Sequence, residues 1–317
     1  MQSMQMGQFS SAAFIKDLGR GKEGARSLSQ EDTQNLWAAV LDGAVSDLEL
    51  GAILIAWRIK GESPTELIGM LRAVDAHLLP MPATQRPVLV IPTYNGARNL
   101  PNLVPLLAGL AARAGLNVLV HGLQEDASMW GAERVTTFEV WQALGWPVAL
   151  DDQSLAQIWA AGQPAFMPID ALCPSLDRLL SMRRVLGVRN SSHTLVKLLQ
   201  PFPKDGLLLA CYTHPEYAES LSQLFLLNGT RALLSRATEG EAVANVRKPS
   251  VIDRYDSGAF DRVWVPDESS KSFDLALPER AAGPTAEWIN TILEGGLPAP
   301  EAIKRQLAIA RATLGGL

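Results

Sequence analysis

The chain has 317 residues, enough for two domains of about 150 residues each or for one large α/β domain with an appendage. Its 47% hydrophobic and 19% charged residues are typical of folded globular proteins and exclude a disordered chain. The 28 Lys and Arg against 33 Asp and Glu give a net charge of −5, which excludes a uniformly basic coat for nucleic acid but not a local basic patch.

The cellular location is predicted from the cysteine count and from hydropathy. Cys173 and Cys211 are too few for a disulfide framework, which favours a reducing cytoplasm. No apolar stretch approaches the ~20 residues of a membrane span, and the polar N-terminal residues have no signal-peptide core. We therefore expect a cytoplasmic protein with no membrane partner.

Residues 1–80 are predicted to form a small all-α domain. Three serines are each followed, three residues later, by an acidic residue, which is the spacing of a capping box at a helix start. These pairs are Ser29 with Asp32, Ser46 with Glu49, and Ser63 with Glu66. Apolar residues recur at helical spacing after each pair, and Gly43 and Gly61 end the first two helices. Prolines between residues 79 and 87 indicate a linker.

Residues 86–317 are predicted to form an α/β domain. Short apolar, β-rich runs alternate there with helix-compatible stretches, which favours a mostly parallel sheet covered on both faces. The expected strands cover residues 88–91, 117–120, 148–150, 166–169, 207–212 and 232–235. Residues 243–265 are expected to be loop and irregular β, followed by two helices after Pro284 and Pro300.

Several short motifs are better explained as structural than as catalytic. Residues 19–24 match Gly-x-Gly-x-x-Gly, but they follow a predicted helix outside any βαβ unit, so we expect a flexible basic turn. No nucleophile elbow occurs, and neither cysteine lies in a catalytic signature. The histidines are too far apart in sequence for zinc-type spacing: they are His77, His121, His193 and His214. We expect no metal site and no cofactor.

The charge distribution points to an anion site. Residues 178–204 contain six cations and no carboxylate: Arg178, Arg183, Arg184, Arg189, Lys197 and Lys204. Positive charges so close together repel one another unless a bound anion neutralises them. The competing interpretation is a solvated helix face, although such faces normally interleave both signs.

Several segments resemble the anthranilate phosphoribosyltransferases of glycosyltransferase family 3. Residues 28–81, with Arg-Ile-Lys-Gly-Glu-Ser-Pro at 58–64, resemble the helical domain of these enzymes, and the likeness continues through residues 118–122 and 183–189. The resemblance implies the phosphoribosyltransferase and nucleoside phosphorylase-like fold, with a small helical domain and a large α/β domain. It also implies that helices around 174–199 return to the helical domain, and that the chain forms a homodimer through that domain.

The catalytic motifs of that family are altered here. The family binds a diphosphate on a Gly-Thr-Gly-Gly-Asp loop, whereas residues 92–99 read Pro-Thr-Tyr-Asn-Gly-Ala-Arg-Asn. The family's Lys-His-Gly-Asn-Arg becomes Val-His-Gly-Leu-Gln at 120–124, and its magnesium-binding Asp-Glu pair falls at Ala242 and Val243. Arg183 stands where the family has its anthranilate-binding arginine. Loss of the metal ligands is expected to slow phosphoribosyl transfer severely.

The altered motifs resemble the YbiB-type branch of this family, in order along the chain, at residues 92–98, 187–198 and 237–241. That resemblance implies a dimer that binds nucleic acid without evident sequence preference. Our leading hypothesis is a non-catalytic nucleic-acid-binding homodimer, with DNA favoured over RNA and with contacts to phosphates. The predicted binding residues are Arg178, Arg183, Arg184, Arg189, His193, Lys197 and Lys204.

Two other functions stay open from the sequence. The first is a phosphoribosyl or glycosyl transferase with an altered substrate, and the second is a sensor of small anions or nucleotides. Both would use the degenerate cleft, formed by Tyr94, Asn95, Gly96, Arg98, His121, Glu239 and Glu241. A shifted carboxylate pair at 239 and 241 is disfavoured, because one intervening residue would point the two side chains to opposite sides of an extended segment.

Overall fold

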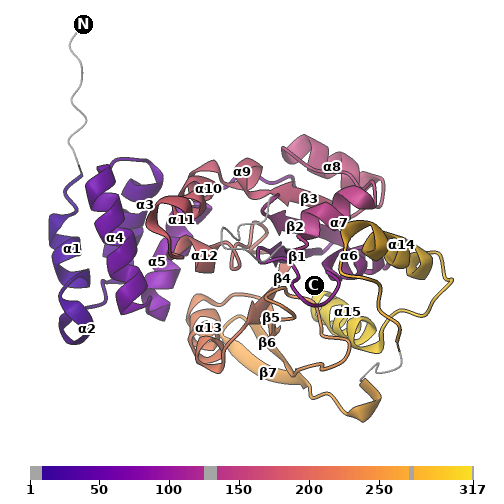
Figure 1. Ribbon diagram of the computed structural model, residues 1–317. Helices are drawn as coiled ribbons and strands as arrows, with labels where there is room; N and C mark the ends of the chain where they lie inside the picture. Colours follow the sequence, from indigo (N-terminus) through magenta and orange to yellow (C-terminus); the bar gives the residue numbers. More distant parts are fainter. Residues whose placement is uncertain (1–8, 125–133, 271–274, 316–317) are drawn as a thin grey trace, which may run out of the picture. The chain divides into compact units, whose positions relative to one another are not determined.

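The computed structural model describes residues 9–124, 134–270 and 275–315. The chain divides into two compact units, labelled by element in Figure 1. The helical unit comprises Met1–Leu78 and Cys173–Val196, and the sheet unit comprises Leu79–Leu172 and Lys197–Leu317. Each unit is therefore built from two separate segments of the sequence.

Among the described residues of the helical unit, helices are the only regular secondary structure. They are α1 (Ala12–Leu18), α2 (Gly21–Gly24), α3 (Gln30–Leu41), α4 (Asp47–Lys60), α5 (Pro64–Asp75), α10 (Pro174–Ser181), α11 (Arg183–Leu186) and α12 (Ser192–Leu195). Complete capping boxes begin α4 at Ser46 and α5 at Ser63. The predicted turn at residues 19–24 instead contains the short helix α2.

The core of the helical unit forms around two tryptophans and one carboxylate. Trp37 of α3 and Trp57 of α4 meet edge to face, with ring centroids 5.6 Å apart. Helix α5 lies close to α3 at Gly69, where an added Cβ would come within 2.4 Å of the Gln30 carbonyl oxygen. Glu66 of α5 is fully buried and accepts a hydrogen bond from the Trp57 indole at 3.1 Å.

The sheet unit has a seven-stranded sheet in the order β3-β2-β1-β4-β5-β6-β7. Its strands are β1 (Val88–Thr93), β2 (Asn117–Gly122), β3 (Ala165–Pro168), β4 (Gly206–Tyr212), β5 (Ala232–Arg236), β6 (Ile252–Asp256) and β7 (Ala259–Trp264). Strands β1 to β5 are parallel, whereas β5, β6 and β7 pair antiparallel. The predicted fold class, a helical domain with a mostly parallel α/β domain, is confirmed.

One strand prediction was wrong, and another segment is more ordered than predicted. Residues 148–150 form no strand and contribute one isolated bridge, from Val148 to Phe166. The segment expected to be loop and irregular β contains the antiparallel hairpin of β6 and β7, whose register shifts between Ile252 and Asp253. Strand β7 lies at the sheet edge with most of its residues exposed, and ion pairs such as Arg262 to Asp253 (2.8 Å) cross the hairpin. An exposed, charged strand lacks the apolar alternation by which strands are recognised.

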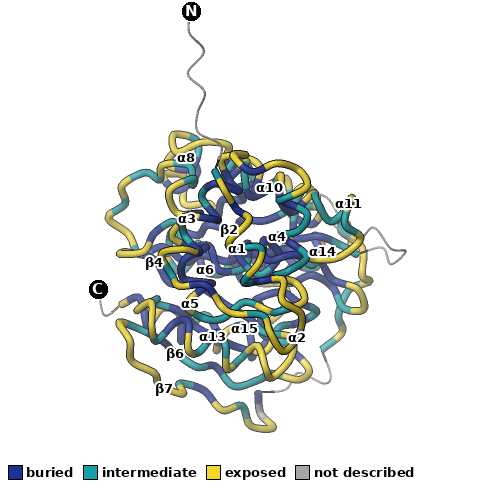
Figure 2. The backbone as a smooth tube through the Cα atoms, turned by 90° about the vertical axis from the view of Figure 1, so that its left-hand side faces the viewer, coloured by how far each residue is buried: buried dark blue, intermediate teal, exposed yellow. Residues whose placement is uncertain are grey.

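Helices flank the sheet, and strands β1 and β2 are buried along their whole length, whereas the edge strand β7 is mostly exposed (Figure 2). These helices are α6 (Val104–Arg113), α7 (Thr137–Ala143), α8 (Asp152–Ala160), α9 (Ile169–Leu172), α13 (Pro215–Asn228), α14 (Ala282–Leu293) and α15 (Glu301–Leu314), with a 3₁₀ turn at Glu268–Ser270. Side chains of α6, α7, α14 and α15 share one apolar core with β1, β2 and β4. Helix α13 packs on β4, β5 and β6, where Phe225 contacts Tyr255. Within the described ranges, no helix is long and apolar enough to cross a membrane.

Candidate functional site

The strand order places the loop after β1 at a point where ligands bind in open α/β sheets. The chain runs outward from β1 to β2 on one side, and from β4 to β5 on the other. The crevice at the carboxyl ends of strands on either side of such a reversal is the usual binding position. Residues 94–99 follow β1 directly, and residues 237–241 follow β5, so both segments start from this edge.

Backbone amides of the loop after β1 converge on the chain's own carboxylates. Oε1 of Glu241 accepts hydrogen bonds from the backbone N–H groups of Tyr94 (3.3 Å), Asn95 (2.7 Å) and Gly96 (2.6 Å). Gly96 has a φ of 67°, which turns successive amides to one side. We call the backbone N–H groups of residues 94–96, 98 and 99 the amide cradle.

Glu239 binds the second half of the amide cradle. Its Oε2 accepts from the backbone N–H groups of Arg98 and Asn99, the latter at 2.5 Å. Its Oε1 accepts from the Asn99 side-chain amide at 3.0 Å. The sequence had placed the carboxylates of Glu239 and Glu241 on opposite sides of an extended segment, and that prediction was wrong, because both reach the same loop.

A tight turn explains how both carboxylates reach the amide cradle. Thr238 and Glu241 exchange two backbone hydrogen bonds, at 3.0 and 2.9 Å, which close the turn. Glu239 has a left-handed φ of 56° and Gly240 a φ of 98°. A Cβ at Gly240 would lie 2.4 Å from the Asn95 side-chain nitrogen, which donates to the Gly240 carbonyl. Only glycine fits this position.

The two carboxylates differ in their electrostatics. Burial raises the pKa of Glu241, and the hydrogen bonds from Thr93 and the loop amides offset this effect only in part. The pKa of Glu239 is lowered, because its partial desolvation is outweighed by the hydrogen bonds from Asn99 and Arg98. The three loop amides bind Oε1 of Glu241, and its Oε2 is buried.

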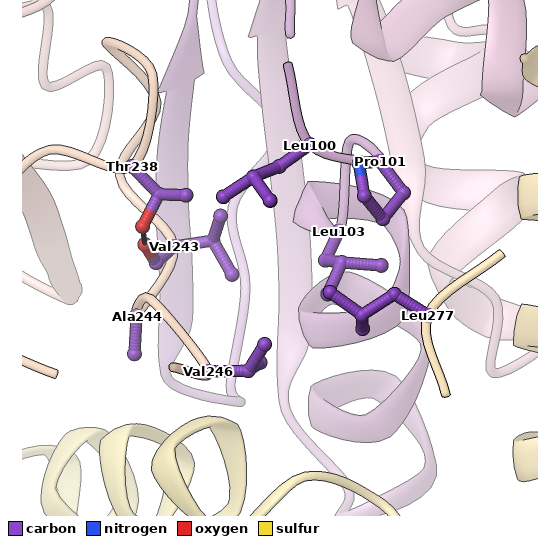
Figure 3. Close-up of a pocket in the computed structure, with 8 residues that line it drawn as sticks. All are labelled: Leu100, Pro101, Leu103, Thr238, Val243, Ala244, Val246 and Leu277. Atoms are coloured by element: carbon purple, nitrogen blue, oxygen red, sulfur yellow. Dashed lines mark hydrogen bonds between the residues drawn. The ribbon is translucent and has the colours of Figure 1, made fainter. Parts of the chain in front are cut away.

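The position of the family's magnesium ligands is apolar in this chain. Ala242 and Val243 are buried, and Val243 lines a small pocket with Leu100, Leu103 and Leu277 (Figure 3). The pocket has room for about one water molecule. Magnesium requires oxygen ligands, so the residues present at this position do not fit it. Among the described residues, no group of three or more His, Cys, Asp or Glu could hold a metal ion.

His121 and Cys211, also near the carboxyl ends of the strands, are both uncharged near neutral pH. Burial lowers the pKa of His121 to about 4, and its Nε2 lies 3.3 Å from the Leu199 carbonyl oxygen. Burial raises the pKa of the Cys211 thiol to about 12. His121 therefore carries no charge to attract a phosphate, and Cys211 is not a thiolate nucleophile at pH 7.

The predicted basic residues are divided between the two units. Arg178, Arg183, Arg184, Arg189 and His193 belong to the helical unit, whereas Lys197 and Lys204 belong to the sheet unit. The structure brings Arg183 and Arg184 together on α11, with Arg189 in the following loop. Arg184, Arg189 and Lys204 are exposed, and Arg183 and Lys197 are partly buried.

Two of the predicted residues make contacts that support the fold. The Arg178 guanidinium donates to the Val40 carbonyl at 2.7 Å and to the Leu41 carbonyl at 3.4 Å, at the C-terminal end of α3. His193 is buried, and its Nδ1 lies 3.2 Å from the Asn190 backbone nitrogen. Both side chains are therefore engaged in contacts within the helical unit.

Sequence reasoning missed two features of these regions. Asn99 contributes both its backbone and its side chain to Glu239, and its position in the altered loop was the available signal. Val185 and Val188 are 78% and 39% exposed beside the arginines of α11. Helix α11 has no buried residue, so Val185 is not part of a core.

Comparisons with known proteins agree with this architecture. Residues 12–78 match the helical bundle domain of the glycosyl transferase family. YbiB of Escherichia coli K12 is 40% identical over 299 residues, which cover 93% of this chain and 91% of YbiB. The anthranilate phosphoribosyltransferase of Methylocella silvestris is 28% identical over 282 residues, which cover 88% of this chain and 79% of the enzyme.

Solved structures of the enzymes share the fold. The anthranilate phosphoribosyltransferase of Thermus thermophilus matches with a TM-score of 0.74 at 22% identity, over 96% of this chain and 89% of that enzyme. The enzyme of Saccharomyces cerevisiae, solved with PRPP and Mg, matches with a TM-score of 0.68 at 15% identity, over 96% and 88%. The chain therefore belongs to the family of YbiB, on an anthranilate phosphoribosyltransferase-like scaffold.

Proposed function

We propose that this protein is a non-catalytic, sequence-independent nucleic-acid-binding homodimer that binds phosphates through residues 178–204, the basic segment. The observation that carries the proposal is the exposure of Arg184 and Arg189 within a run of six cations and no carboxylate. Arginine matches phosphate geometry through its planar fork of donors. Phosphate contacts carry no base information, so binding independent of sequence is the expected mode.

The absence of transferase activity is supported by the amide cradle and the magnesium position. A diphosphate needs free amide donors and a metal ion to balance its charge. Here Glu239 and Glu241 occupy the amides, and Ala242 and Val243 replace the metal ligands. A substrate with several negative charges would also meet the carboxylate of Glu239, whose pKa is lowered.

A homodimer through the helical unit is supported by an apolar stripe on α4. Leu48, Ala52, Ile55 and Ile59 recur at intervals of four, three and four residues, which places them on one helix face. Leu48 is 84% and Ile59 68% exposed, which is unusual for large aliphatic side chains so closely grouped. A second copy of the chain would cover this stripe and would double the number of cations.

The proposal is tested by titrating two unrelated duplex oligonucleotides of equal length at several salt concentrations, with fluorescence anisotropy as the readout. Each neutralised phosphate should contribute about 0.9 to the slope of log affinity against log salt. Arg184→Ala with Arg189→Ala should lower that slope by about 1.8 for each subunit that contacts the duplex, and should weaken both sequences alike.

The matched control is Arg305→Ala with Arg311→Ala, which removes two exposed cations from α15 of the sheet unit. This control should leave the slope within experimental error of the parent protein. A flat salt dependence of the parent, or equal effects of the two double variants, would contradict the assignment of the basic segment. Affinities that differ between the two oligonucleotides by more than about tenfold would contradict sequence independence.

A further inference from the structure

We propose that the sheet unit carries a base-stacking surface for single-stranded nucleic acid, made of three aromatic rings and three cations that follow the ends of β4 and β5. We call these six residues the stacking surface: Tyr212, His214, Tyr217, Arg236, Arg247 and Lys248. The inference rests on the proposed nucleic-acid binding and deepens it, because it names the form of nucleic acid that gains a contact beyond those of the basic segment.

Two aromatic rings after β4 are exposed beside one another. Tyr217 is 48% exposed, and His214 is exposed as well. Their ring centroids lie 6.2 Å apart, with the ring planes tilted by 43°. Folded chains gain much stability by covering such rings, and among the described Phe, Tyr and Trp residues only Tyr217 and Phe260 are left exposed. The pair at 214 and 217 therefore presents aromatic faces that a ligand can cover.

The strand register brings these rings to the same sheet face as a cation. Cys211 belongs to the core that β4 shares with α15, so alternation directs Tyr212 to the opposite face, on which α13 packs. Tyr212 pairs with Arg236 in the parallel register of β4 and β5, so both side chains lie on that face. Helix α13 begins directly after β4, with His214 as its N-cap residue and Tyr217 in its first turn. The rings and Arg236 therefore lie at the carboxyl edge of one sheet face.

The cations next to the rings are not neutralised by carboxylates. The backbone N–H of Arg236 donates to Oγ of Ser250 at 3.1 Å, which ties the end of β5 to the segment that carries Arg247 and Lys248. All three cations are exposed, and within the described ranges none of them forms an ion pair. The arginines of the β6–β7 hairpin, by contrast, are paired with aspartates. Cations beside exposed rings are the combination by which proteins hold the phosphates and bases of a single strand.

Two carboxylates on α13 set the direction of the bound strand. Glu216 and Glu219 are exposed and lie on either side of Tyr217 in the sequence. They repel phosphates from α13, whereas the three cations attract phosphates toward the end of β5. We therefore expect bases over the rings of His214 and Tyr217, with the sugar-phosphate backbone on the side of Arg236.

The aromatic faces select a single strand over a duplex. In a duplex, neighbouring base pairs cover the face of each base, whereas the bases of a single strand can be splayed out and stacked on aromatic side chains. Such stacking tolerates all bases, since every base has a π face. The stacking surface thus adds a contact to single strands and keeps binding independent of sequence.

The test uses the full-length protein with two single-stranded probes of about 20 nucleotides, oligothymidylate and an abasic strand of equal length. The abasic strand keeps every phosphate and offers no base. Its affinity therefore reports phosphate contacts, and the ratio of the two affinities, the base ratio, reports stacking. Measured by fluorescence anisotropy, the parent protein should bind oligothymidylate at least about tenfold more tightly than the abasic strand.

Variants of the rings should change the base ratio alone. His214→Ala with Tyr217→Ala should lower the ratio to below about threefold and leave the affinity for the abasic strand unchanged. Tyr217→Phe keeps the ring and should keep the ratio of the parent. The matched control is Phe260→Ala, which removes a 51% exposed ring near the amino end of β5 and should also keep the ratio.

Variants of the cations should change the salt dependence. Arg247→Ala with Lys248→Ala should lower the slope of log affinity against log salt for oligothymidylate by about 1.4 for each subunit that contacts the strand. The slope should fall equally for the abasic strand, because both probes carry the same phosphates. An unchanged slope would remove these two cations from the stacking surface.

A base ratio near one in the parent protein, or a ratio that the double ring variant leaves unchanged, overturns the proposal. If that variant does not fold, Tyr217→Ala alone has to lower the ratio at least about threefold. Arg184→Ala with Arg189→Ala separates this inference from the proposed function, because it should weaken binding of both probes and keep the ratio. If that variant binds both probes like the parent while the ratio still depends on Tyr217, the basic segment is refuted and the stacking surface stands.

Discussion

Glu66 and Glu241 are both buried carboxylates, and the donors around them give the two groups opposite pKa shifts. Burial would raise the pKa of Glu66, but the hydrogen bonds from Lys60 at 2.6 Å and from the Ser63 and Leu28 amides outweigh it and lower the pKa. The pKa of Glu241 is raised, because it is buried and its donors are all neutral. The pKa shifts of the two carboxylates differ in sign because Glu66 has a charged donor, Lys60, and Glu241 has none.

Replacing Glu66 is predicted to destabilise the helical unit strongly. Glu66→Ala leaves the Lys60 ammonium, the Trp57 indole and the Leu28 amide without their acceptor. Breaking a buried ion pair costs about 3–5 kcal/mol, so urea denaturation followed by circular dichroism should show a loss of that size. Glu287→Ala, an exposed control, should stay within about 0.5 kcal/mol of the parent. A loss below about 1 kcal/mol for Glu66→Ala would contradict its central role.

His77 is predicted to make stability depend on pH. Its Nδ1 lies 2.7 Å from the Ala73 carbonyl oxygen and its Nε2 2.9 Å from Asp42, so only the imidazolium donates to both acceptors. Burial alone would lower the pKa of His77. The hydrogen bonds to Asp42 and Ala73 have the larger, opposite effect, so the pKa is raised overall. The stabilisation is therefore complete below the unfolded pKa of about 6.5 and is lost as the pH rises through the folded pKa.

The variant His77→Ala should accordingly lose up to about 1 kcal/mol of stability at pH 5.5 and less at pH 9. The value is small because the pair is partly exposed to solvent. Urea denaturation at the two pH values measures the difference. An equal loss at both would show that the imidazolium has no special role.

At the scale of elements, the exposed stripe of α4 distinguishes this helix from its neighbours. Helix α5 buries most of its residues within the helical unit, whereas α4 keeps Leu48 and Ile59 exposed. Because the capping boxes at Ser46 and Ser63 are local, the sequence predicted both helix starts correctly. It did not predict which apolar residues of α4 would stay exposed, since periodicity alone does not say what packs on a helix face.

Charging this stripe is predicted to separate the subunits. Leu48→Glu with Ile59→Glu would bury two carboxylates against an apolar partner surface, at a cost that a dimer contact cannot offset. Light scattering at micromolar concentration should give half the mass of the parent protein. Leu227→Glu, at a residue of α13 that is 65% exposed, is the control and should leave the mass unchanged. A parent protein that is already monomeric would contradict the dimer.

At the scale of the whole molecule, the scaffold of a transferase is retained while the residues for its chemistry differ. The chain keeps the fold over 96% of its length relative to the Thermus thermophilus enzyme. Its magnesium position is apolar, and its amide cradle is occupied by Glu239 and Glu241. A shared fold therefore does not establish a shared activity, and the function has to be argued from the residues of the site.

The protein is accordingly predicted not to transfer a phosphoribosyl group to anthranilate. Incubation with anthranilate, phosphoribosyl pyrophosphate and magnesium should leave the fluorescence of anthranilate unchanged. The anthranilate phosphoribosyltransferase of Methylocella silvestris, assayed in parallel, is the positive control. Turnover at about 1 per second or faster, the lower end of ordinary enzyme rates, would contradict the prediction.

Short windows of the sequence are enough to predict most helix starts and strands and to show that the metal ligands are replaced. Helix starts at Ser46 and Ser63, the apolar strands and the residues Ala242 and Val243 are all visible within short windows. Such features depend on capping geometry and on hydrophobic periodicity, which act over a few residues.

Contacts between groups far apart in the sequence could not be predicted in this way. Arg178 binds the C-terminal carbonyls of α3, and Glu241 binds amides that precede it by about 146 residues in the chain. The meeting of Glu241 with the cradle depends on the strand order, which brings the loops after β1 and β5 to one edge, and on left-handed backbone at Glu239 and Gly240. Neither is encoded in local periodicity, because sheet order and long-range hydrogen bonds are chosen by the packing of the whole unit.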